Sequence, residues 1–285
     1  MIRPLRADDL PGLTLLVQSL LPATVVTCAG LAHLQRWTDW WVAEADGEIV
    51  GGARAGRGGR AWVGVHAEAR RSGVGAALLD QVETRLRQAG EQVVEGWSDD
   101  EAGAGFAAAR GYVRARGKPV SLLDLATTEL PPLEPPEGVR LHRLGDLAHR
   151  MRELHGLAAQ CYADEPGGAQ GEMPFGRWLE EDMGLPDISR EGSIVAEAGG
   201  ELVAYAILLT DGATRGENDF TGTRREYRNR GLARLVKLAS LHWAREHGVR
   251  EVWTGNDEEN APMLSVNRGL GYRITHTRSK HVRRL

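Results

Sequence analysis

Arg70-Arg-Ser-Gly-Val-Gly75 is repeated, in altered form, as Arg228-Asn-Arg-Gly-Leu-Ala233. Each copy follows a short β-like segment, residues 61–65 or 218–223, and is expected to open an amphipathic helix. Basic side chains and exposed amides at a helix N-terminus attract phosphate, and glycine lets an anion approach the backbone. The chain therefore carries a pyrophosphate-binding pattern twice, which indicates a duplicated fold that binds a phosphate-containing cofactor.

Length and composition restrict the possible classes. A chain of 285 residues suits two domains. A net charge of −4 gives no support to a nucleic-acid or anionic-membrane partner. No apolar run is long enough to span a bilayer, residues 1–9 lack the pattern of a signal peptide, and Cys28 and Cys161 lie far apart. These features favour a cytoplasmic protein without a disulfide.

A cluster of prolines predicts the domain boundary. Residues 127–138 contain four prolines, which exclude a helix and favour an extended linker. We therefore expect an N-terminal domain over residues 1–129, a linker over 130–138 and a C-terminal domain over 139–285. Both halves contain a two-residue hairpin turn, Asp46-Gly47 or Gly199-Gly200, and both predict the order β-α-β-β-β-α-β-α-β.

Two other interpretations of the repeated motif are weaker. One isolated copy is equally well explained as a glycine-containing loop with solvated arginines, but two copies behind matched hairpins argue against that. A dinucleotide-binding domain would open its first βα unit with Gly-x-Gly-x-x-Gly. No such run is present there, and three hairpin-linked strands precede each motif.

Both halves resemble the GCN5-related N-acetyltransferase (GNAT) superfamily, whose signature is Arg/Gln-x-x-Gly-x-Gly/Ala. The C-terminal half is the closer match, from residues 221–233 through 256–264 to Gly271-Tyr272. The tandem layout is similar to that of the mycothiol synthases, which acetylate an amine on a sugar-linked cysteine. The resemblance implies an α/β fold of two tandem GNAT-like domains, each a mixed, centrally splayed β-sheet flanked by helices.

The resemblance also implies acetyl-CoA as the acyl donor, and no metal. The pyrophosphate would lie on the amides around residues 228–233, and the pantetheine arm would pair with residues 220–223 like an added strand. In the C-terminal half the expected coenzyme-binding residues are Phe220, Thr221, Thr223, Arg228, Asn229, Arg230, Gly231, Leu232, Ala233, Asn256 and Asn260. In the N-terminal half they are Val63, Val65, Arg70, Arg71, Ser72, Gly73, Val74 and Gly75.

Asn260 has a second interpretation. It precedes Ala261-Pro262, and proline favours the first turn of a helix. Asn260 is therefore equally explicable as a helix N-cap, and a cap and a coenzyme contact can coexist.

Acetyl transfer to an amine needs a base, donors for the oxyanion and an acid for the departing thiolate. Glu217 matches the position where the resembled synthases carry a glutamate base, and strand alternation predicts that Asp219 points to the same side. The alternative is that Glu217 is a solvated carboxylate at a strand end.

Several groups are candidates for the acid that protonates the departing thiolate. Many GNAT enzymes carry a tyrosine five residues before the aromatic residue of Gly271-Tyr272, and here that position is Asn267. Either Asn267 only forms hydrogen bonds, or Ser265 or a water substitutes, or the thiolate leaves unassisted. In the N-terminal half the matching residue is Ala107, and the strand before the motif has no carboxylate. That half is expected to bind coenzyme A without using it.

An acidic, glycine-rich segment over residues 162–174 would border the acceptor pocket in the resembled fold. Asp164, Glu165 and Glu172 would suit a cationic amine, although a surface loop with no ligand explains the segment as well.

The sequence thus predicts an acetyl-CoA-dependent N-acyltransferase that acts on a primary amine of a small molecule in its C-terminal domain. Two alternatives remain, a non-catalytic protein that binds or senses acyl-CoA, and an N-acetyltransferase of proteins. The expected partners include a small-molecule amine, with no nucleic acid or membrane, and the chain is expected to be a monomer or a homodimer.

Overall fold

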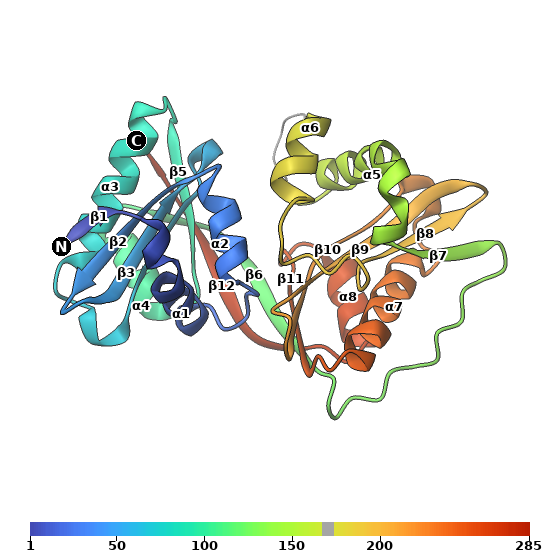
Figure 1. The fold of residues 1–285 in the computed structure, drawn as a ribbon. Helices are drawn as coiled ribbons and strands as arrows, with labels where there is room; N and C mark the ends of the chain where they lie inside the picture. Colours follow the sequence, from blue (N-terminus) through green and yellow to red (C-terminus); the bar gives the residue numbers. More distant parts are fainter. Residues whose placement is uncertain (167–173) are drawn as a thin grey trace. The chain divides into compact units, whose positions relative to one another are not determined.

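The computed structural model describes residues 1–166 and 174–285, which form two compact units (Figure 1). Unit 1 contains Met1–Lys118 and His276–Leu285, and unit 2 contains Pro119–Thr275. The sequence predicts a boundary at residues 130–138, whereas the units divide after Lys118 and after Thr275. The difference arises because two long strands, β6 (Val113–Asp124) and β12 (Arg273–Arg284), each contribute residues to both units.

Unit 1 is built on an antiparallel sheet with the strand order β1-β2-β3-β4. A further strand, β5, pairs with residues 279–284 of β12, so the end of the chain completes the first unit. The strands are β1 (Ile2–Pro4), β2 (Asp39–Ala45), β3 (Glu48–Ala55), β4 (Ala61–Val65) and β5 (Val93–Ser98). The helices are α1 (Leu10–Leu20), α2 (Cys28–Gln35), α3 (Val74–Gln88) and α4 (Glu101–Ala109).

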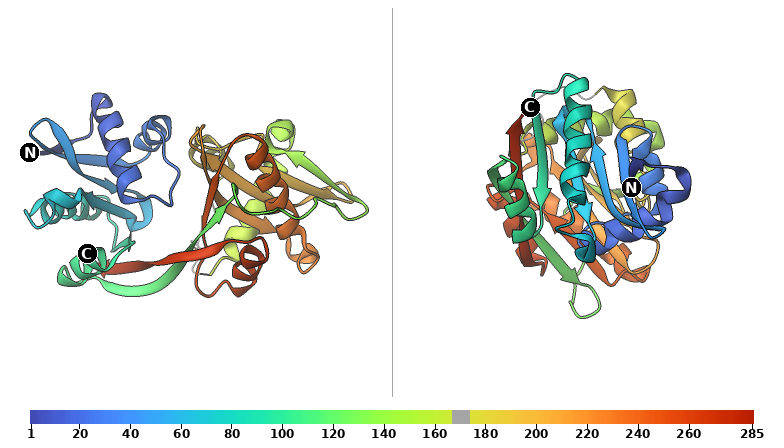
Figure 2. Two further views of the ribbon diagram at one scale, coloured as in Figure 1. Left: turned by 90° about the horizontal axis from the view of Figure 1, so that it is seen from below. Right: turned by 90° about the vertical axis from the view of Figure 1, so that its left-hand side faces the viewer.

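Helices cover both faces of this sheet, as the right-hand view of Figure 2 shows with α1 and α2 in dark blue and α3 in teal. Leu13 and Leu31 of α1 and α2 pack on Trp40 and Val42 of β2. On the other face the apolar stripe of α3 packs on small residues of β2 and β3. The second of these apolar layers holds α3, and with it the first repeated motif, against the sheet.

Unit 2 has the strand order β6-β11-β10-β9-β8-β7. Helix α7 packs on one face of the sheet, and α5 contacts β9 and β10. The strands are β7 (Val139–Arg143), β8 (Ile194–Ala198), β9 (Glu201–Thr210), β10 (Arg215–Thr223) and β11 (Glu251–Gly255). The helices are α5 (Met151–Ala163), the single turn α6 (Phe175–Arg177), a π-helical turn (Trp178–Asp182), α7 (Leu232–Glu246) and α8 (Ala261–Gly269).

The strand that precedes each motif separates from its parallel neighbour. In the described part of the chain, strand β4 has no ladder with β5, and the one bridge joins Arg60, just before β4, to Glu95 of β5. Strand β10 pairs with β11 only over residues 215–217 and 251–253. The expected α/β architecture of mixed, centrally splayed sheets flanked by helices is thus confirmed, and each splay leaves backbone groups available for a ligand.

Local turn chemistry follows the sequence. Asp46, Gly47, Gly199 and Gly200 all have positive φ angles, as a two-residue type I′ hairpin turn requires. The proline-rich residues 125–138 form no helix or strand, and they belong to unit 2, where His242 Nε2 lies 2.8 Å from the carbonyl oxygen of Pro131.

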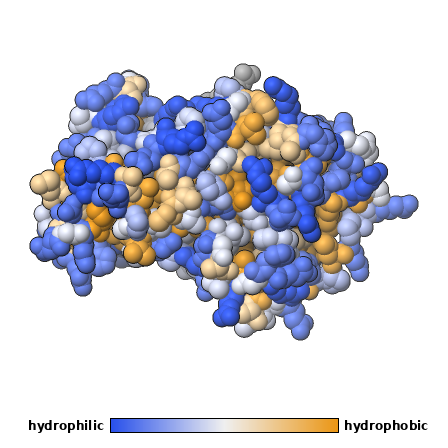
Figure 3. Space-filling view, in the orientation of Figure 1, coloured by the Kyte–Doolittle hydropathy of each residue, from blue (hydrophilic) through white to orange (hydrophobic). Residues whose placement is uncertain are grey.

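Within the described ranges no helix is long and apolar enough to cross a membrane. Hydrophilic side chains dominate the face seen in Figure 3, where apolar residues show in smaller areas between them.

Candidate active site

The two motifs share one backbone conformation. Arg71 and Asn229 have φ angles of 63° and 61°, and Gly73 and Gly231 have φ angles of 86° and 75°. The glycine in each copy is the N-cap of α3 or α7, and no side chain caps either helix. The first amides of both helices are therefore free of side-chain caps, which is the arrangement that binds phosphate groups.

The first arginine of each motif is held by the preceding strand. Nε of Arg70 donates to the carbonyl oxygen of Val65, and Nε of Arg228 donates to that of Thr223, at 3.2 Å in both cases. The two guanidinium groups are thus fixed at the same place, beside the open end of each splay. Arg230, by contrast, folds back onto the ring of Tyr227.

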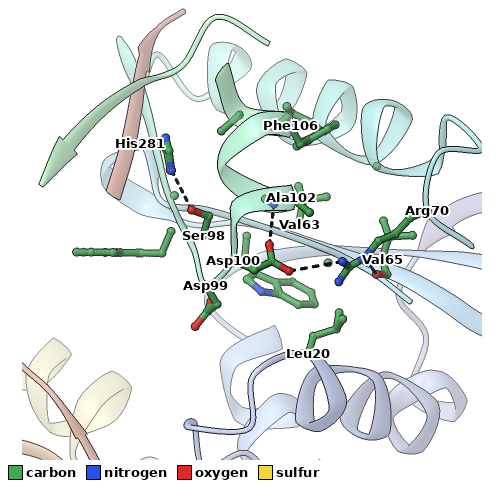
Figure 4. Close-up of a pocket in the computed structure, with 18 of the residues that line it drawn as sticks. Leu20, Val63, Val65, Arg70, Ser98, Asp99, Asp100, Ala102, Phe106 and His281 are labelled. Carbon is green, nitrogen blue, oxygen red and sulfur yellow. Dashed lines mark hydrogen bonds and ion pairs between the residues drawn. The ribbon is translucent and has the colours of Figure 1, made fainter. Parts of the chain in front are cut away.

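A cavity of about 570 Å³ lies in unit 1 between the separated strands β4 and β5 (Figure 4). This volume is in the range of ligand-binding pockets, about 300–1,000 Å³. Of the eight residues predicted to bind coenzyme here, six line the cavity, and Ser72 and Val74 do not. The six are Val63, Val65, Arg70, Arg71, Gly73 and Gly75.

Several lining residues of this cavity were not predicted. Leu20, Trp62 and Phe106 make it largely apolar, and Arg70 forms an ion pair with Asp100 at 3.5 Å (Figure 4). His281 comes from β12 and lies with Nε2 2.9 Å from Oγ of Ser98. No local signal could have placed residue 281 in the first unit, since only the long-range strand pairing puts it there.

Ala107, which stands at the position of the tyrosine that acts as the acid in many GNAT enzymes, also lines the cavity. The nearby Tyr112 donates a hydrogen bond of 2.9 Å to Glu83, and burial together with that bond raises its pKa. The carboxylates at the cavity are Asp99, which pairs with Arg278, and Asp100. No carboxylate lies on β4.

In unit 2, Glu217 lies at the apex of the splay. It pairs with Trp253 in the last pair that β10 forms with β11, and its side chain is partly buried. A β-bulge follows, because Asn218 is opposite Leu208 and Phe220 is opposite Ile207, which leaves Asp219 as the extra residue. The bulge removes the regular alternation on which the expected common side of Glu217 and Asp219 was based, and Asp219 is exposed.

The bulge determines what faces each side of β10. Asn218 is buried and accepts a 2.6 Å hydrogen bond from the hydroxyl of Tyr272. Phe220 packs against Tyr162 and Tyr205, with ring centroids 4.5 and 5.5 Å away. The sequence did not single out Asn218, although its place between two acidic residues of one strand could have indicated a buried polar group.

Of the remaining strand residues predicted to bind coenzyme, Thr221 is opposite Ala206, and Thr223 holds Arg228 through its carbonyl oxygen. At the helix, Leu232 is buried in the core of unit 2, so only its backbone amide is available to a ligand, while Ala233 is partly exposed.

The three asparagines have different partners. Asn267 is 2% exposed, and its Nδ2 donates to Oδ1 of Asn256 at 2.6 Å. Asn260 is the N-cap of α8, with Oδ1 accepting from the amide of Met263 at 3.3 Å. The cap interpretation of Asn260 is therefore confirmed, while the Asn256–Asn267 pair joins the residue after β11 to α8.

Asp164 lies at the end of α5. Its side chain contacts arginines at the motif loop and does not point into open solvent. It accepts hydrogen bonds of 2.7 and 2.5 Å from Arg225, and it also pairs with Arg228. These contacts, Arg225 first, lower the pKa of Asp164 to about 2. Its charge is shared between two arginines, so the structure links Asp164 to the phosphate side of the site. Glu165 follows it in the same turn, and Glu172 lies outside the described residues.

Within the part of the chain that the structure describes, no three His, Cys, Asp or Glu side chains are grouped as metal ligands.

Two family models match the chain, one in each half. Residues 153–272 match the acetyltransferase (GNAT) family, and residues 36–114 match an acetyltransferase (GNAT) domain. The mycothiol acetyltransferase of Nocardioides sp. is 31% identical over 225 residues, with 73% of this chain and 74% of that protein covered. The mycothiol acetyltransferase of Thermomonospora curvata is 29% identical over 259 residues, with 90% and 78% covered.

Solved structures share the fold over the whole chain. A tandem GNAT protein from the clavulanic acid biosynthesis pathway superposes with a TM-score of 0.77 and 22% identity, covering 100% of this chain and 98% of the other. A GCN5-related N-acetyltransferase from Sphaerobacter thermophilus gives a TM-score of 0.74 and 21% identity, covering 100% and 95%. The tandem arrangement is therefore found along nearly the full length of both proteins.

Proposed function

The chain belongs to the acetyltransferase (GNAT) family, and we propose that its C-terminal half transfers an acetyl group from acetyl-CoA to a primary amine of a small molecule. N-acetyltransferase activity follows from the family. The observation that carries the finer proposal is Glu217, a partly buried carboxylate at the apex of the splay that opens toward the second motif. The N-terminal half has the same motif but no carboxylate on the matching strand.

The chain offers a suitable cradle for acetyl-CoA in unit 2. The uncapped amides at the start of α7 and the Arg228 guanidinium would hold the pyrophosphate. The part of β10 beyond Glu217 no longer pairs with β11, so its backbone is available to the pantetheine arm along Phe220–Thr223. The coenzyme would supply the activated acetyl group.

Glu217 would act as the general base. The attacking amine must lose a proton as it adds to the thioester carbonyl, and a carboxylate accepts that proton directly or through one water. Asp219, on the bulge, is near enough to the aromatic pair Tyr162 and Tyr205 for its charge to help raise the pKa of both, after burial. Asp219 therefore lies where it would attract a protonated amine to the same side as α5.

The acceptor amine would be recognised by this acidic and aromatic surface of β10. Asp164 contributes indirectly, because it fixes Arg225 and Arg228. The relatives that are named mycothiol acetyltransferases support a small-molecule acceptor.

The N-terminal half supports a second role, binding of acyl-CoA without turnover. The intact motif and the apolar cavity beside it favour this role, and Ala107 offers no group for proton transfer. In this arrangement one chain would hold two coenzyme molecules and use one.

The test is acetyl-CoA turnover with a panel of amines, followed by the release of free coenzyme A. Glu217→Gln should lower kcat about 100-fold or more, because it removes the base. Glu251→Gln is the matched control, since Glu251 is an exposed carboxylate on the neighbouring strand β11. If Glu217→Gln matched the wild type on every amine, or if no amine gave turnover, the proposal would fail. Acetylation of peptides alone would favour a protein substrate.

A further inference from the structure

Lys237 is an unusual residue in the core of unit 2. It lies on α7, is 1% exposed, and holds its Nζ 5.1 Å from the ring centroid of Tyr272. Lysine is almost never fully buried unless a carboxylate pairs with it. Among the residues that the structure describes, no carboxylate pairs with Lys237. A buried ammonium without a counterion is costly to the fold, so its presence requires another explanation.

The duplicated unit shows what this position faces. Lys237 and Leu79 both stand six positions after the left-handed glycine that opens the motif helix, Gly231 or Gly73. In unit 1, Leu79 lines the cavity next to the phosphate motif. The duplication therefore places the Lys237 side chain toward the corresponding space between β10 and β11.

The neighbours of the two residues correspond as well. In each unit the amide of the buried tyrosine donates to the carbonyl oxygen five residues earlier, Tyr112 to Ala107 at 3.0 Å and Tyr272 to Asn267 at 3.1 Å. Ala107 and Tyr112 both line the cavity of unit 1. Asn267 and Tyr272 thus occupy the matching wall in unit 2, and Tyr272 is the ring beneath Lys237.

In unit 2 this wall carries the amide of Asn267 where unit 1 has Ala107. Oδ1 of Asn267 and Nδ2 of Asn218 are buried and have no hydrogen-bond partner among the described residues. Asn218 also accepts the hydroxyl of Tyr272, which links the wall to the strand that carries Glu217. Buried polar atoms without partners indicate a site that a ligand or water completes.

We propose that the ammonium group of Lys237 protonates the thiolate of coenzyme A as it departs in the C-terminal unit. This inference rests on the proposed function, because it assigns the acid of that same reaction. Asn267, which stands at the position of the usual tyrosine, cannot donate an acidic proton, whereas Lys237 can.

The step balances as follows. The amine nitrogen bonds to the acetyl carbon and gives one proton to Glu217. The carbon–sulfur bond then breaks, and its electron pair stays on sulfur. Lys237 gives one proton to that sulfur and becomes a neutral amine. Lys237 then regains a proton from solvent, and Glu217 releases its proton to solvent. The products are the amide and the free thiol, with no oxidant or metal needed.

The electrostatic setting suits an acid that works near neutral pH. Burial alone lowers the pKa of Lys237 to about 7. The titratable group against it is Tyr272, which is not a cause of the shift, and no carboxylate of the described residues contributes to it either. Since the protonated form disappears above this pKa, kcat should fall as the pH rises from 7 to 9.

The first experiment compares Lys237→Leu with wild type across this pH range. Leucine is the residue of the other copy, so the variant should fold, and Lys237→Met provides a second uncharged side chain. We expect kcat at pH 7 to fall about 100-fold, KM for acetyl-CoA to change little, and the fall of kcat above pH 7 to disappear. Ser240→Ala, one turn along the same helix, is the matched control and should keep the wild-type profile. If both Lys237 variants kept kcat, or kept the alkaline fall, the proposal would be overturned.

The second experiment needs no turnover. The ultraviolet absorbance of the thiolate is titrated for coenzyme A bound to each protein. The ammonium and the thiolate stabilise each other when both are charged, so the bound thiolate should form at a lower pH in the wild type than in Lys237→Leu at one bound site. Equal thiol pKa values in the two proteins would overturn the proposal even if the enzyme is active. A lowered thiol pKa in a protein that acetylates no amine would support the placement of Lys237 and refute the proposed function.

Discussion

At the residue scale, the two halves differ most where a proton must move. Unit 1 has Ala107 and Leu79 at the two positions where unit 2 has Asn267 and Lys237. Both units have a buried tyrosine near these positions. The hydroxyl of Tyr112 donates to Glu83 in unit 1, and the hydroxyl of Tyr272 donates to Asn218 in unit 2. In the proposed function, these few side chains on the same backbone would separate a unit that only holds a ligand from one that performs acid–base chemistry.

Lys237 gives a prediction about stability that is independent of catalysis. Its pKa is about 7 in the folded chain and 10.5 when exposed, so between these values the unfolded chain binds more protons. The free energy of unfolding of the wild type should therefore rise with pH from 7 to 10.5. Lys237→Leu should be more stable by about 1–4 kcal/mol below pH 7 and should lose this rise.

Denaturant unfolding at a series of pH values measures this effect, with Ser240→Ala as the control. A wild-type curve with the same pH slope as Lys237→Leu would contradict a buried ammonium with a lowered pKa.

At the element scale, the conformation of each motif loop sets the orientation of the first amides of the helix that follows it. The two left-handed residues of each loop turn the chain so that the first amides of α3 or α7 face outward. A carboxylate from another element, Asp100 in unit 1 and Asp164 in unit 2, holds the first arginine of the motif. The two units therefore share the geometry of this motif, although only unit 2 has a candidate base on the preceding strand.

Substitution of the N-cap glycines tests which cradle serves catalysis. An added Cβ at Gly73 or Gly231 meets open space, so the cost of alanine is the left-handed backbone, roughly 1–2 kcal/mol. The added Cβ would also stand in the open space through which a phosphate approaches the amides, so Gly231→Ala should lose both turnover and one coenzyme-binding event. Gly73→Ala should lose a binding event and keep turnover.

Titration calorimetry with coenzyme A, together with the turnover assay, gives the answer. Gly105→Ala, in the middle of α4 with open space around it, is the control and should keep both binding events. Turnover lost in Gly73→Ala and kept in Gly231→Ala would assign the chemistry to the other half.

At the scale of the whole molecule, the chain is not divided into two consecutive domains. Unit 1 depends on His276–Leu285, which pair with β5 and bring His281 to the cavity. Unit 2 in turn includes residues 119–124 of β6, and this strand pairs with β11. Each unit is thus completed by a strand from the other half of the sequence.

This contribution of strands from the other half of the sequence predicts which fragments of the chain fold. Residues 1–129 alone should not fold stably, because β5 would lose its partner strand and expose a sheet edge. Residues 1–118 joined by a glycine–serine linker to residues 276–285 should fold and bind coenzyme A. Thermal unfolding followed by circular dichroism compares the two fragments, and a cooperative transition in residues 1–129 alone would refute the dependence.

The sequence by itself determined the features that depend on local chemistry. The motif glycines require positive φ angles, the Asp46-Gly47 and Gly199-Gly200 pairs form the predicted turns, and Asn260 caps α8. These could be predicted because a few neighbouring residues fix each conformation. The shared backbone conformation of the two motif loops belongs to the same class.

Only the tertiary structure decided the features that join distant segments. The bulge at Asp219 depends on the register of β10 against β9, and the contact of Asp164 with Arg228 joins a loop to a motif far along the chain. The burial of Lys237 against Tyr272 and the strand that carries His281 into unit 1 are of the same kind. Sequence spacing cannot give these contacts, since packing and strand pairing between distant segments select them.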